Sequence, residues 1–446
     1  MSSLRDPSRL MDALSRGHRP PSEFRLGLEY EMFVTGLDGH AVPYRGPGGM
    51  AEILESLARR TGWRRLEEDG ALLGLAAEDG RGITLEPGAQ IEFNSSPREG
   101  VAAIQEELEE IVGHFDALCR EFGVRFLGLG AQPADPPDRI ERIPKARYEV
   151  LEPYLAGAGE LGLWMMKATC GTQVNFDHAD PADAALKMRT GFALAPILSA
   201  LFANSTLRAG EPSGYASWRG HVWTATDDTR CGIPARLVAA DSSLADYVDW
   251  ALDVPMLFVL QGGRPQDGRG RSFRQFLATG QATTEDWELH LSTLFPEVRF
   301  RPQLEIRSTD TGCPDMALAL CALVKGVFYS PEALEAAWQL TAGWSHHQRI
   351  SAWKDAHHRG LAAPLADGRK LLDYARWLVD LADLPAEELA YLKPLHQILE
   401  KGMSEGEEMA ALVEQDWGED PLTQVVEASY CLPRKLAPSG DGAARS

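Results

Sequence analysis

The sequence predicts an α+β fold in which an antiparallel sheet is backed by helices and followed by a helical C-terminal region. Its strand-like segments lack the regular crossover helices that a parallel sheet requires. Residues 317–432 read as mostly helical, and no proline-rich or loop segment marks a domain boundary. We therefore expect a single domain over residues 1–446, with a sheet-rich part at 1–313, a mainly helical part at 314–432 and a flexible tail at 437–446.

The composition is that of a folded, soluble protein, with 44% hydrophobic and 24% charged residues. There are 44 Lys and Arg residues against 65 Asp and Glu, a net charge of -21, which argues against nucleic acid or an anionic membrane as the main partner. No apolar run approaches the ~18 residues of a membrane span, and the N-terminus lacks the apolar core of a signal peptide. We expect a cytoplasmic protein with no membrane partner.

The six cysteines are scattered and form no CxxC pair. Zinc-site spacing is therefore absent, and a dense disulfide framework is not expected. Cysteines in a reducing compartment are mostly buried thiols, and that is the expectation here.

The first half of the chain predicts strands interrupted by helices. A short helix precedes the strand "FRLGLEYEMFV", and "ITLEPGAQIEFNSS" reads as two strands separated by a Pro-Gly break. A long helix follows, because apolar residues from Ile104 to Leu118 keep a spacing of three to four. The predicted ranges are helix 7–15, strand 24–34, helix 49–61, strands within 83–96 and helix 95–123.

The later segments of the sequence predict further strands of the sheet and a helix that packs against it. Strands are expected at 124–133 and 167–178, and a helix at 181–204. The Gly- and Arg-rich segment 262–271 predicts a mobile hairpin or loop. "EVRFRPQLEIRSTD", residues 297–310, closes the strand-bearing part.

Four of these strands carry polar side chains two residues apart, which places both on one face. An antiparallel sheet often keeps one face in water, and this explains any one strand alone. The set is dominated by carboxylates and amides, however, and clustered carboxylates repel unless a cation lies between them. Oxygen ligands of this kind suit Mg²⁺. The pairs are Glu29 with Glu31, Gln90 with Glu92 (Glu86 lies just upstream), Gln173 with Asn175, and Glu305 with Arg307.

This pattern indicates a magnesium–nucleotide site built on a sheet. Neither GxxxxGK(S/T) nor a complete GxGxxG is present, so no phosphate-binding loop is predicted. No Ser/His/Asp or Cys/His arrangement stands out either.

Basic residues provide further candidates, each with two interpretations. Lys145 and Arg147 in "IPKARYEV" could meet phosphate or carboxylate, or could be ordinary surface residues. Arg219, between Trp218 and Trp223, could hold a carboxylate in a fork or pack on the aromatic rings. Two histidine pairs near residues 346 and 357 lack acidic or cysteine companions and are interpreted as a solvated helix face.

The sequence resembles the glutamate–cysteine ligases of the plant and proteobacterial type over almost its whole length. The resemblance rests on dispersed motifs in the same order: "GLEYEMF", "LEPGAQIEF", "IPKARYEVLEPY", "TCGTQVNFD", "SGYASWRGHVWTATDDTRCGIP", "TLFPEVRFRPQLEIRSTD" and "WGEDPLTQVVEASY". It implies a glutamine-synthetase-like catalytic fold whose curved antiparallel sheet forms a bowl. It also implies ATP-dependent joining of the glutamate γ-carboxyl to the cysteine amine.

The resemblance also implies roles for individual residues. Arg307 lies near the transferred phosphate and acts in catalysis with Glu305, while Arg219 holds the glutamate α-carboxylate. The other expected groups are the metal ligands Glu29, Glu31, Glu86, Glu92 and Glu305, the nucleotide-binding residues Gln173, Asn175, Lys145 and Arg147, and the substrate-pocket residues Trp223, Leu257, Met165 and Met166.

The chemistry of such a reaction explains why no protein nucleophile is predicted. A carboxylate has only oxide as a leaving group, whereas the acyl phosphate made from ATP loses phosphate when an amine attacks. Positioning and electrostatics carry most of this reaction. The expected partners are the small molecules glutamate, cysteine and ATP, with Mg²⁺, and the expected assembly is a monomer or homodimer.

Three positions depart from the family pattern. Ala89 replaces the second glycine of "LEPGGQ", which adds a methyl group. Leu257 replaces a tyrosine that lines the substrate pocket in the plant enzymes, so another amine acceptor is the alternative to cysteine. The hairpin near 262–271 has no cysteine, so no hairpin disulfide switch is expected. A non-catalytic relative is the hypothesis of another class, and retention of the acids and of both arginines argues against it.

Overall fold

The computed structural model describes residues 8–415 and 420–430. The predicted tail at 437–446 lies outside the described residues. Within them, one large sheet of nine strands runs in the order β14-β15-β7-β1-β5-β4-β3-β2, with β6 paired to β1. Every pairing in it is antiparallel. The predicted α+β class with a large antiparallel sheet is confirmed.

The strands of the large sheet are short except for the first, which lies at its centre. They are β1 (Leu26–Thr35), β2 (Arg64–Glu68), β3 (Ala71–Ala76), β4 (Gly82–Leu85), β5 (Ile91–Asn94), β6 (Arg125–Leu127), β7 (Gly171–Phe176), β14 (Val298–Phe300) and β15 (Leu304–Asp310). Smaller pairs are formed by β8 (Leu207–Arg208) with β9 (Glu211–Pro212), β10 (Cys231–Gly232) with β13 (Phe295–Pro296), and β11 (Phe258–Gln261) with β12 (Arg264–Asp267).

The helices of the sheet-rich part are α1 (Ser8–Ser15), α2 (Met50–Thr61), α3 (Val101–Phe122), α4 (Arg147–Ala158), α5 (Gly162–Ala168), α6 (Pro181–Leu201), α7 (Trp218–Thr224), α8 (Leu244–Asp253), α9 (Phe273–Ala278) and α10 (Thr284–Leu291). Those of the C-terminal part are α11 (Pro314–Phe328), α12 (Pro331–Thr341), α13 (His346–Arg359), α14 (Leu371–Asp380), α15 (Lys393–Lys401), α16 (Glu405–Gln415) and α17 (Pro421–Ala428). This part is mainly helical, as predicted.

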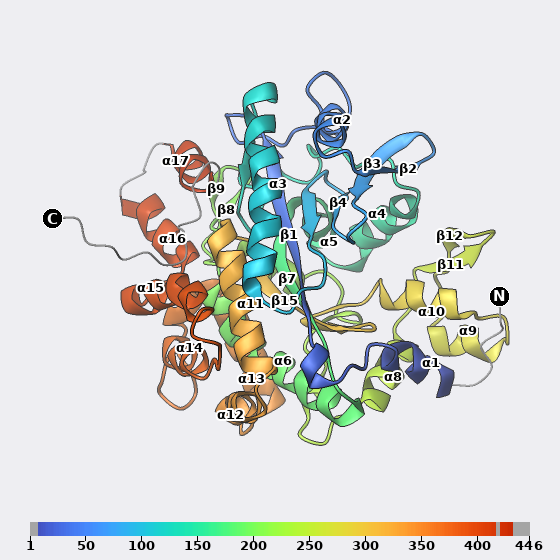
Figure 1. Cartoon of the computed structure of the whole chain (residues 1–446), viewed down its shortest axis with the longest axis vertical. Helices are drawn as coiled ribbons and strands as arrows, with labels where there is room; N and C mark the ends of the chain where they lie inside the picture. The colour runs from blue at the N-terminus through green and yellow to red at the C-terminus, as the bar shows by residue number, and fades with distance from the viewer. Residues whose placement is uncertain (1–7, 416–419, 431–446) are drawn as a thin grey trace.

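The central strands have one apolar face and one polar face. On β7, Val174 and Phe176 are fully buried, and Val174 is the cross-strand partner of Ile306 on β15. Helices α3, α6 and α11 pack against these strands, and Figure 1 shows α3 and α11 running alongside β1, β7 and β15. Because side chains alternate along a strand, the polar residues between these apolar ones face the opposite side.

The register of the sheet brings the polar pairs together. Glu31 lies opposite Glu92, and Glu29 lies opposite Gln173. Directly opposed residues on antiparallel strands share a face, so their side chains are neighbours. The polar face therefore carries carboxylates and amides from several strands side by side.

Several predicted boundaries shift. The strand expected at 124–133 is confined to β6, and the segment expected as strand from residue 167 begins inside α5. The long helix starts at Val101, after the extended Gly100, and ends at left-handed Gly123. The hairpin of β2 and β3 was not predicted.

Two further sequence expectations can be compared with the structure. Cys119, Cys170 and Cys321 are buried free thiols, as expected, whereas Cys313 is disulfide-bonded. In the described residues no single helix has the length and apolar character of a membrane span; one sharply bent pair, α11 with α12, meets that test only when both are taken together.

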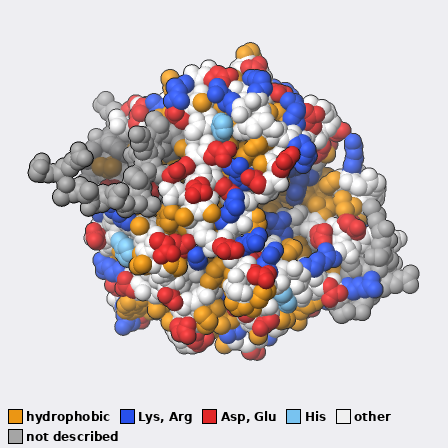
Figure 2. Space-filling view, viewed as in Figure 1, with side chains coloured by type: hydrophobic (Ala, Val, Ile, Leu, Met, Phe, Trp, Pro, Cys, Tyr) orange, Lys and Arg blue, Asp and Glu red, His pale blue; other side chains and the backbone are white. Residues whose placement is uncertain are grey.

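The charged surface is mixed. In Figure 2, acidic and basic side chains are interspersed over the face shown, with no large area of one sign. The excess of acidic residues is thus not concentrated in one patch on this face.

Candidate active site

The polar face of the sheet forms the floor of a cavity of about 290 Å³. Its lining comes from the five neighbouring strands β14, β15, β7, β1 and β5 and from the segments around them. Thirteen of the residues predicted from the sequence line it: Glu29, Glu31, Glu86, Gln90, Glu92, Lys145, Arg147, Met165, Met166, Gln173, Arg219, Trp223 and Arg307. Glu305, Asn175 and Leu257 are not lining residues, although the first two lie directly beside them.

The carboxylates on β1 are held by groups from β7. The Glu29 carboxylate accepts a hydrogen bond from Asn175 Nδ2 at 2.8 Å. The Glu31 carboxylate accepts one from the backbone N–H of Gly171 at 2.5 Å and one from Gln173 Nε2 at 3.0 Å. Asn175 thus contributes by orienting Glu29.

Burial and mutual repulsion disfavour ionisation of these acids. Desolvation, with the charges of Glu305 and Glu92, raises the pKa of Glu29 to about 7. Desolvation and Glu86 raise the pKa of Glu92 to about 7, and desolvation with Glu92 and Glu86 raises the pKa of Glu31 well above its ordinary value. A cation in the cavity would relieve this repulsion.

Glu305 has a different environment. Its buried carboxylate receives a bidentate pair of hydrogen bonds from Arg299, at 2.7 and 2.9 Å, and is 2.5 Å from Arg307 Nη1. Burial opposes its ionisation, but the charges of Arg299, Arg307 and Arg301 outweigh burial and lower its pKa to about 2. Glu305 is therefore already neutralised by arginines.

Arg299 and Arg301 line the cavity, yet neither is among the residues predicted from the sequence. Both follow the rule of spacing two that identified the other pairs, and the strand "VRF" contains the first of them. That spacing was the available signal for both. Asn94 also lines the cavity and continues the spacing of two from Glu92, whereas no spacing pattern distinguishes the further lining residues Tyr148 and Thr169.

The donors suit a hard divalent cation in chemistry, though they have not converged on one point. Across residues 8–415 and 420–430, no three His, Cys, Asp or Glu side chains are grouped closely enough to hold a metal ion. Glu29, Glu31 and Glu92 accept hydrogen bonds from neighbouring amides and hydroxyls, in the last case from Thr84 and Asn94. All are oxygen ligands in one cavity with raised pKa values, which is the donor set that Mg²⁺ prefers.

Positive charge and apolar surface line other parts of the same cavity. Lys145 and Arg147 lie at the start of α4, and the Arg147 guanidinium lies over the Phe258 ring at 5.4 Å. Arg219 on α7 is buried, lies 5.8 Å from the Trp223 ring centroid and donates from Nη2 to the Arg307 carbonyl at 3.2 Å. An apolar wall comprises Leu151, Leu155, Met165, Met166, Trp223 and Phe295.

Leu257 was expected to line the substrate pocket, but the structure places it elsewhere. Its side chain is fully buried in the hydrophobic core and does not line the cavity. The expected solvated face for the histidine pairs is wrong for His357, which is 2% exposed.

The chain is similar to plant enzymes over nearly all its length. It is 35% identical over 430 residues to glutamate–cysteine ligase B, chloroplastic, of Oryza sativa subsp. japonica, covering 93% of this chain and 86% of that protein. It is also 35% identical over 429 residues to glutamate–cysteine ligase, chloroplastic, of Brassica juncea, covering 93% and 83%. The predicted cytoplasmic location is corrected here, because these relatives and that of Arabidopsis thaliana are chloroplastic.

A solved structure and a family model agree with these relatives. The fold is similar to that of a glutamate–cysteine ligase from Francisella tularensis in complex with AMP, with a TM-score of 0.58 and 13% identity over 91% of this chain and 87% of that one. The model of glutamate-cysteine ligase family 2 matches residues 25–428. The chain therefore belongs to glutamate–cysteine ligase family 2.

Proposed function

We propose that the protein joins the γ-carboxyl of L-glutamate to the amine of L-cysteine at the expense of ATP, giving γ-glutamylcysteine, ADP and phosphate. The observation that carries this proposal is a single cavity lined by carboxylates in one part and by an arginine with apolar side chains in another. Buried carboxylates with raised pKa values lie on β1 and β5, and Arg219 lies beside an apolar wall. The names of the plant relatives favour cysteine over another amine as the acceptor.

The residues of the cavity suit the two steps of this reaction. Arg219 would grip the α-carboxylate of glutamate and so direct its side chain along the sheet. A γ-carboxylate oxygen attacks the γ-phosphorus of ATP, the bond to the β-phosphate oxygen breaks, and ADP leaves. The neutral amine then attacks the acyl carbon of γ-glutamyl phosphate, and inorganic phosphate leaves.

We assign the stabilisation of charge in both steps to side chains that line the cavity. Arg307, held by Glu305, would donate to the oxygens of the phosphoryl group, and Lys145 and Arg147, which line the same cavity, would bind the remaining phosphates. Mg²⁺, when bound by Glu29, Glu31, Glu86 and Glu92, would offset phosphate charge. The AMP complex of the structural neighbour supports a nucleotide in this fold.

The direct test is ADP release with Mg-ATP, glutamate and a panel of amino acids and amines. We expect turnover with cysteine; turnover with another amine and none with cysteine would contradict the proposal. Glu29→Gln and Glu305→Gln should abolish ADP formation, whereas Glu332→Gln, at an exposed position on α12, should not. Unchanged turnover in the two site variants would remove their assigned roles.

A further inference from the structure

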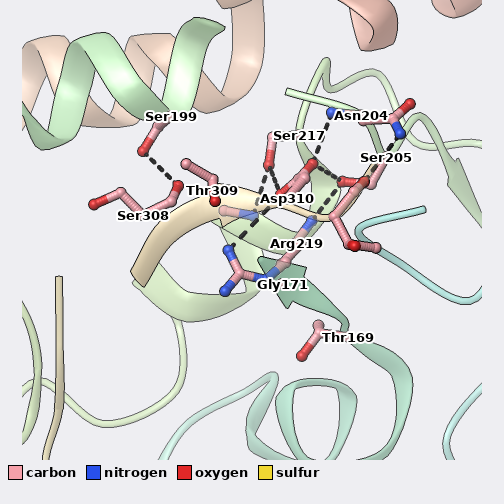
Figure 3. A network of polar contacts seen from close by, with 12 residues as sticks. Thr169, Gly171, Ser199, Asn204, Ser205, Ser217, Arg219, Ser308, Thr309 and Asp310 are labelled. Atoms are coloured by element: carbon pink, nitrogen blue, oxygen red, sulfur yellow. Dashed lines mark hydrogen bonds and ion pairs between the residues drawn. The ribbon is translucent and has the colours of Figure 1, made fainter. Parts of the chain in front are cut away.

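A buried polar network underlies Arg219 and is centred on a carboxylate that has no role in the reaction as described so far. Asp310, the last residue of β15, is 3% exposed (Figure 3). Its Oδ2 accepts hydrogen bonds from the Asn204 N–H at 2.8 Å and the Ser205 hydroxyl at 2.7 Å. Its Oδ1 accepts one from the Ser217 hydroxyl at 2.9 Å. An ionised carboxylate, which only accepts hydrogen bonds, suits all three donors.

The same two serines hold the backbone of the helix that carries Arg219. The Arg219 N–H donates to Ser205 Oγ at 3.1 Å, and the Gly220 N–H donates to Ser217 Oγ at 2.9 Å, which caps α7. Each hydroxyl donates a hydrogen bond to Asp310 and accepts one from a backbone N–H of α7. One carboxylate thereby fixes the orientation of both serines and, through them, the first turn of this helix.

Asp310 also acts on the side chain of Arg219. Oδ1 lies 3.8 Å from Arg219 Nη1, which is within ion-pair range but too long for a hydrogen bond. The carboxylate therefore offsets the buried guanidinium charge without consuming that N–H donor. The donor stays available for an arriving carboxylate.

Two glycines make room for this arrangement. A Cβ at Gly130 would lie 2.4 Å from Asp310 Cγ, and a Cβ at Gly171 would lie 2.6 Å from Arg219 Nη2. Gly171 also donates its N–H to Glu31, so a single peptide contacts both the guanidinium and the carboxylate cluster. The backbone thus confines both charged groups to one position.

We propose that Asp310 is a positioning residue for glutamate binding that acts through Arg219. Through Ser205 and Ser217 it fixes the helical turn that carries Arg219, and it offsets the guanidinium charge while Nη1 stays available as a donor. The inference rests on the proposed function, in which Arg219 grips the glutamate α-carboxylate. It adds an indirect determinant of glutamate affinity that touches no substrate.

The test compares Asp310→Asn with a matched control, Asp177→Asn. Asp177 is also 3% exposed, accepts a hydrogen bond from the Arg25 N–H at 2.9 Å and pairs with Arg19 at 3.4 Å, but does not line the cavity. Glutamate binding is measured by titration calorimetry without ATP, and the KM values for glutamate and ATP by ADP release. We expect D310N to raise the glutamate Kd and KM about tenfold or more, as for loss of a charge-assisted contact, with the KM for ATP within about twofold. D177N should change neither.

Other outcomes are decisive as well. An unchanged glutamate Kd in D310N, or equal losses for glutamate and ATP, would overturn the inference, since the latter indicates general disruption. If D310N does not fold, Ser217→Ala is the deciding variant, because it retains the Asp310 carboxylate and removes one hydroxyl. A smaller loss of affinity for glutamate, with the KM for ATP unchanged, supports the inference. An unchanged affinity for glutamate overturns it. Absence of glutamate binding in the wild-type protein would instead refute the proposed function.

Discussion

At the residue scale, Glu29 and Glu305 show how neighbours set the charge of identical side chains. Desolvation and two nearby carboxylates raise the pKa of Glu29 to about 7, whereas three arginines overcome burial and lower that of Glu305 to about 2. The first group needs an external cation to ionise fully at neutral pH, and the second already has internal ones. The carboxylates that require a bound cation are thus those on β1 and β5.

Removal of Arg299 should expose this dependence. In Arg299→Met, Glu305 loses a buried bidentate partner, and loss of one member of a buried pair costs about 3–5 kcal/mol. We expect a lower urea midpoint and loss of ADP formation. Arg65→Met, which removes exposed ion pairs on β2, should leave the midpoint nearly unchanged. Equal midpoints for the two variants would contradict the assigned role of Arg299.

Ala89 occupies a backbone conformation that favours glycine. Its φ is 65°, in the left-handed region, where an L-residue with a Cβ is disfavoured by roughly 1–2 kcal/mol. Ala89→Gly should therefore raise the melting temperature while ADP formation stays unchanged. Gly88→Ala is the contrasting variant, because its Cβ would lie 2.2 Å from the Lys167 carbonyl oxygen. A lower melting temperature for A89G would refute this account.

The period of the strands was sufficient by itself to predict some of the site residues. Alternation along β1, β5 and β7 was sufficient to group Glu29, Glu31, Glu92 and Gln173 on one face, and the cavity contains them all. Spacing could not show that Glu305 is satisfied by Arg299, because that depends on the pairing of β14 with β15. Nor could a sequence pattern show that Leu257 is fully buried away from the cavity.

At the element scale, α7 is held between the sheet and the C-terminal helices. The Ser217 N–H donates to the His357 carbonyl on α13 at 2.9 Å, and a Cβ at Gly220 would lie 2.2 Å from the His357 ring. The helix carrying Arg219 thus approaches α13 through a glycine. Its position depends on a part of the chain more than a hundred residues away.

Substitution of that glycine should move α7. Gly220→Ala overfills the contact with His357, which typically costs about 1–3 kcal/mol, and we expect a lower melting temperature and a higher KM for glutamate. Gly113→Ala is the control, since Gly113 is an exposed position of α3 where a Cβ meets nothing within 4 Å. It should stabilise the protein by roughly 0.5–1 kcal/mol through helix propensity. Similar effects in both variants would contradict the role of the contact.

A buried histidine on α10 that contacts α8 should make the fold sensitive to acid. Desolvation lowers the pKa of His290 to about 4, although its Nε2 donates to the Ala251 carbonyl at 2.8 Å. Between pH 6.5 and 4 the unfolded chain binds a proton there that the folded protein does not, so stability falls as the pH decreases through this window. The contribution is on the order of 3 kcal/mol.

The measurement is the urea midpoint from pH 7 to pH 4 for the wild type and His290→Gln. We expect the variant to lose less stability across this range than the wild type does. Parallel curves for the two proteins would show that His290 does not carry the acid sensitivity.

The predicted ends of strands were wrong where backbone N–H groups donate to loop carbonyls instead of to a neighbouring strand. Residues 124–133 have the composition of a strand, but Gly128 and Gly130 donate to the Ser429 and Asn204 carbonyls, so the chain leaves the sheet after Leu127. The β2–β3 hairpin was missed because "RRLEE" is charged at four of its five positions, and this composition suits an exposed edge better than a predicted strand. Both errors arise from tertiary pairing that local composition does not encode.

At the scale of the whole molecule, the two predicted parts share one core. Helix α11 packs against β1 and β7, and α13 packs against α6 and α7. Since each part buries apolar surface of the other, we expect thermal unfolding in one transition, with equal calorimetric and van't Hoff enthalpies. An earlier transition confined to the helical part would show instead that residues 314–432 form a separate unit.

The outermost strand of the sheet has a consequence for behaviour at high concentration. Among the residues that the structure describes, strand β2 pairs with β3 on one side only, and four of its five residues are Arg or Glu. A free edge offers unpaired N–H and C=O groups to strands of other chains, and charged side chains along it oppose such addition. The protein can therefore leave this edge of a large antiparallel sheet uncovered and still resist edge-to-edge aggregation.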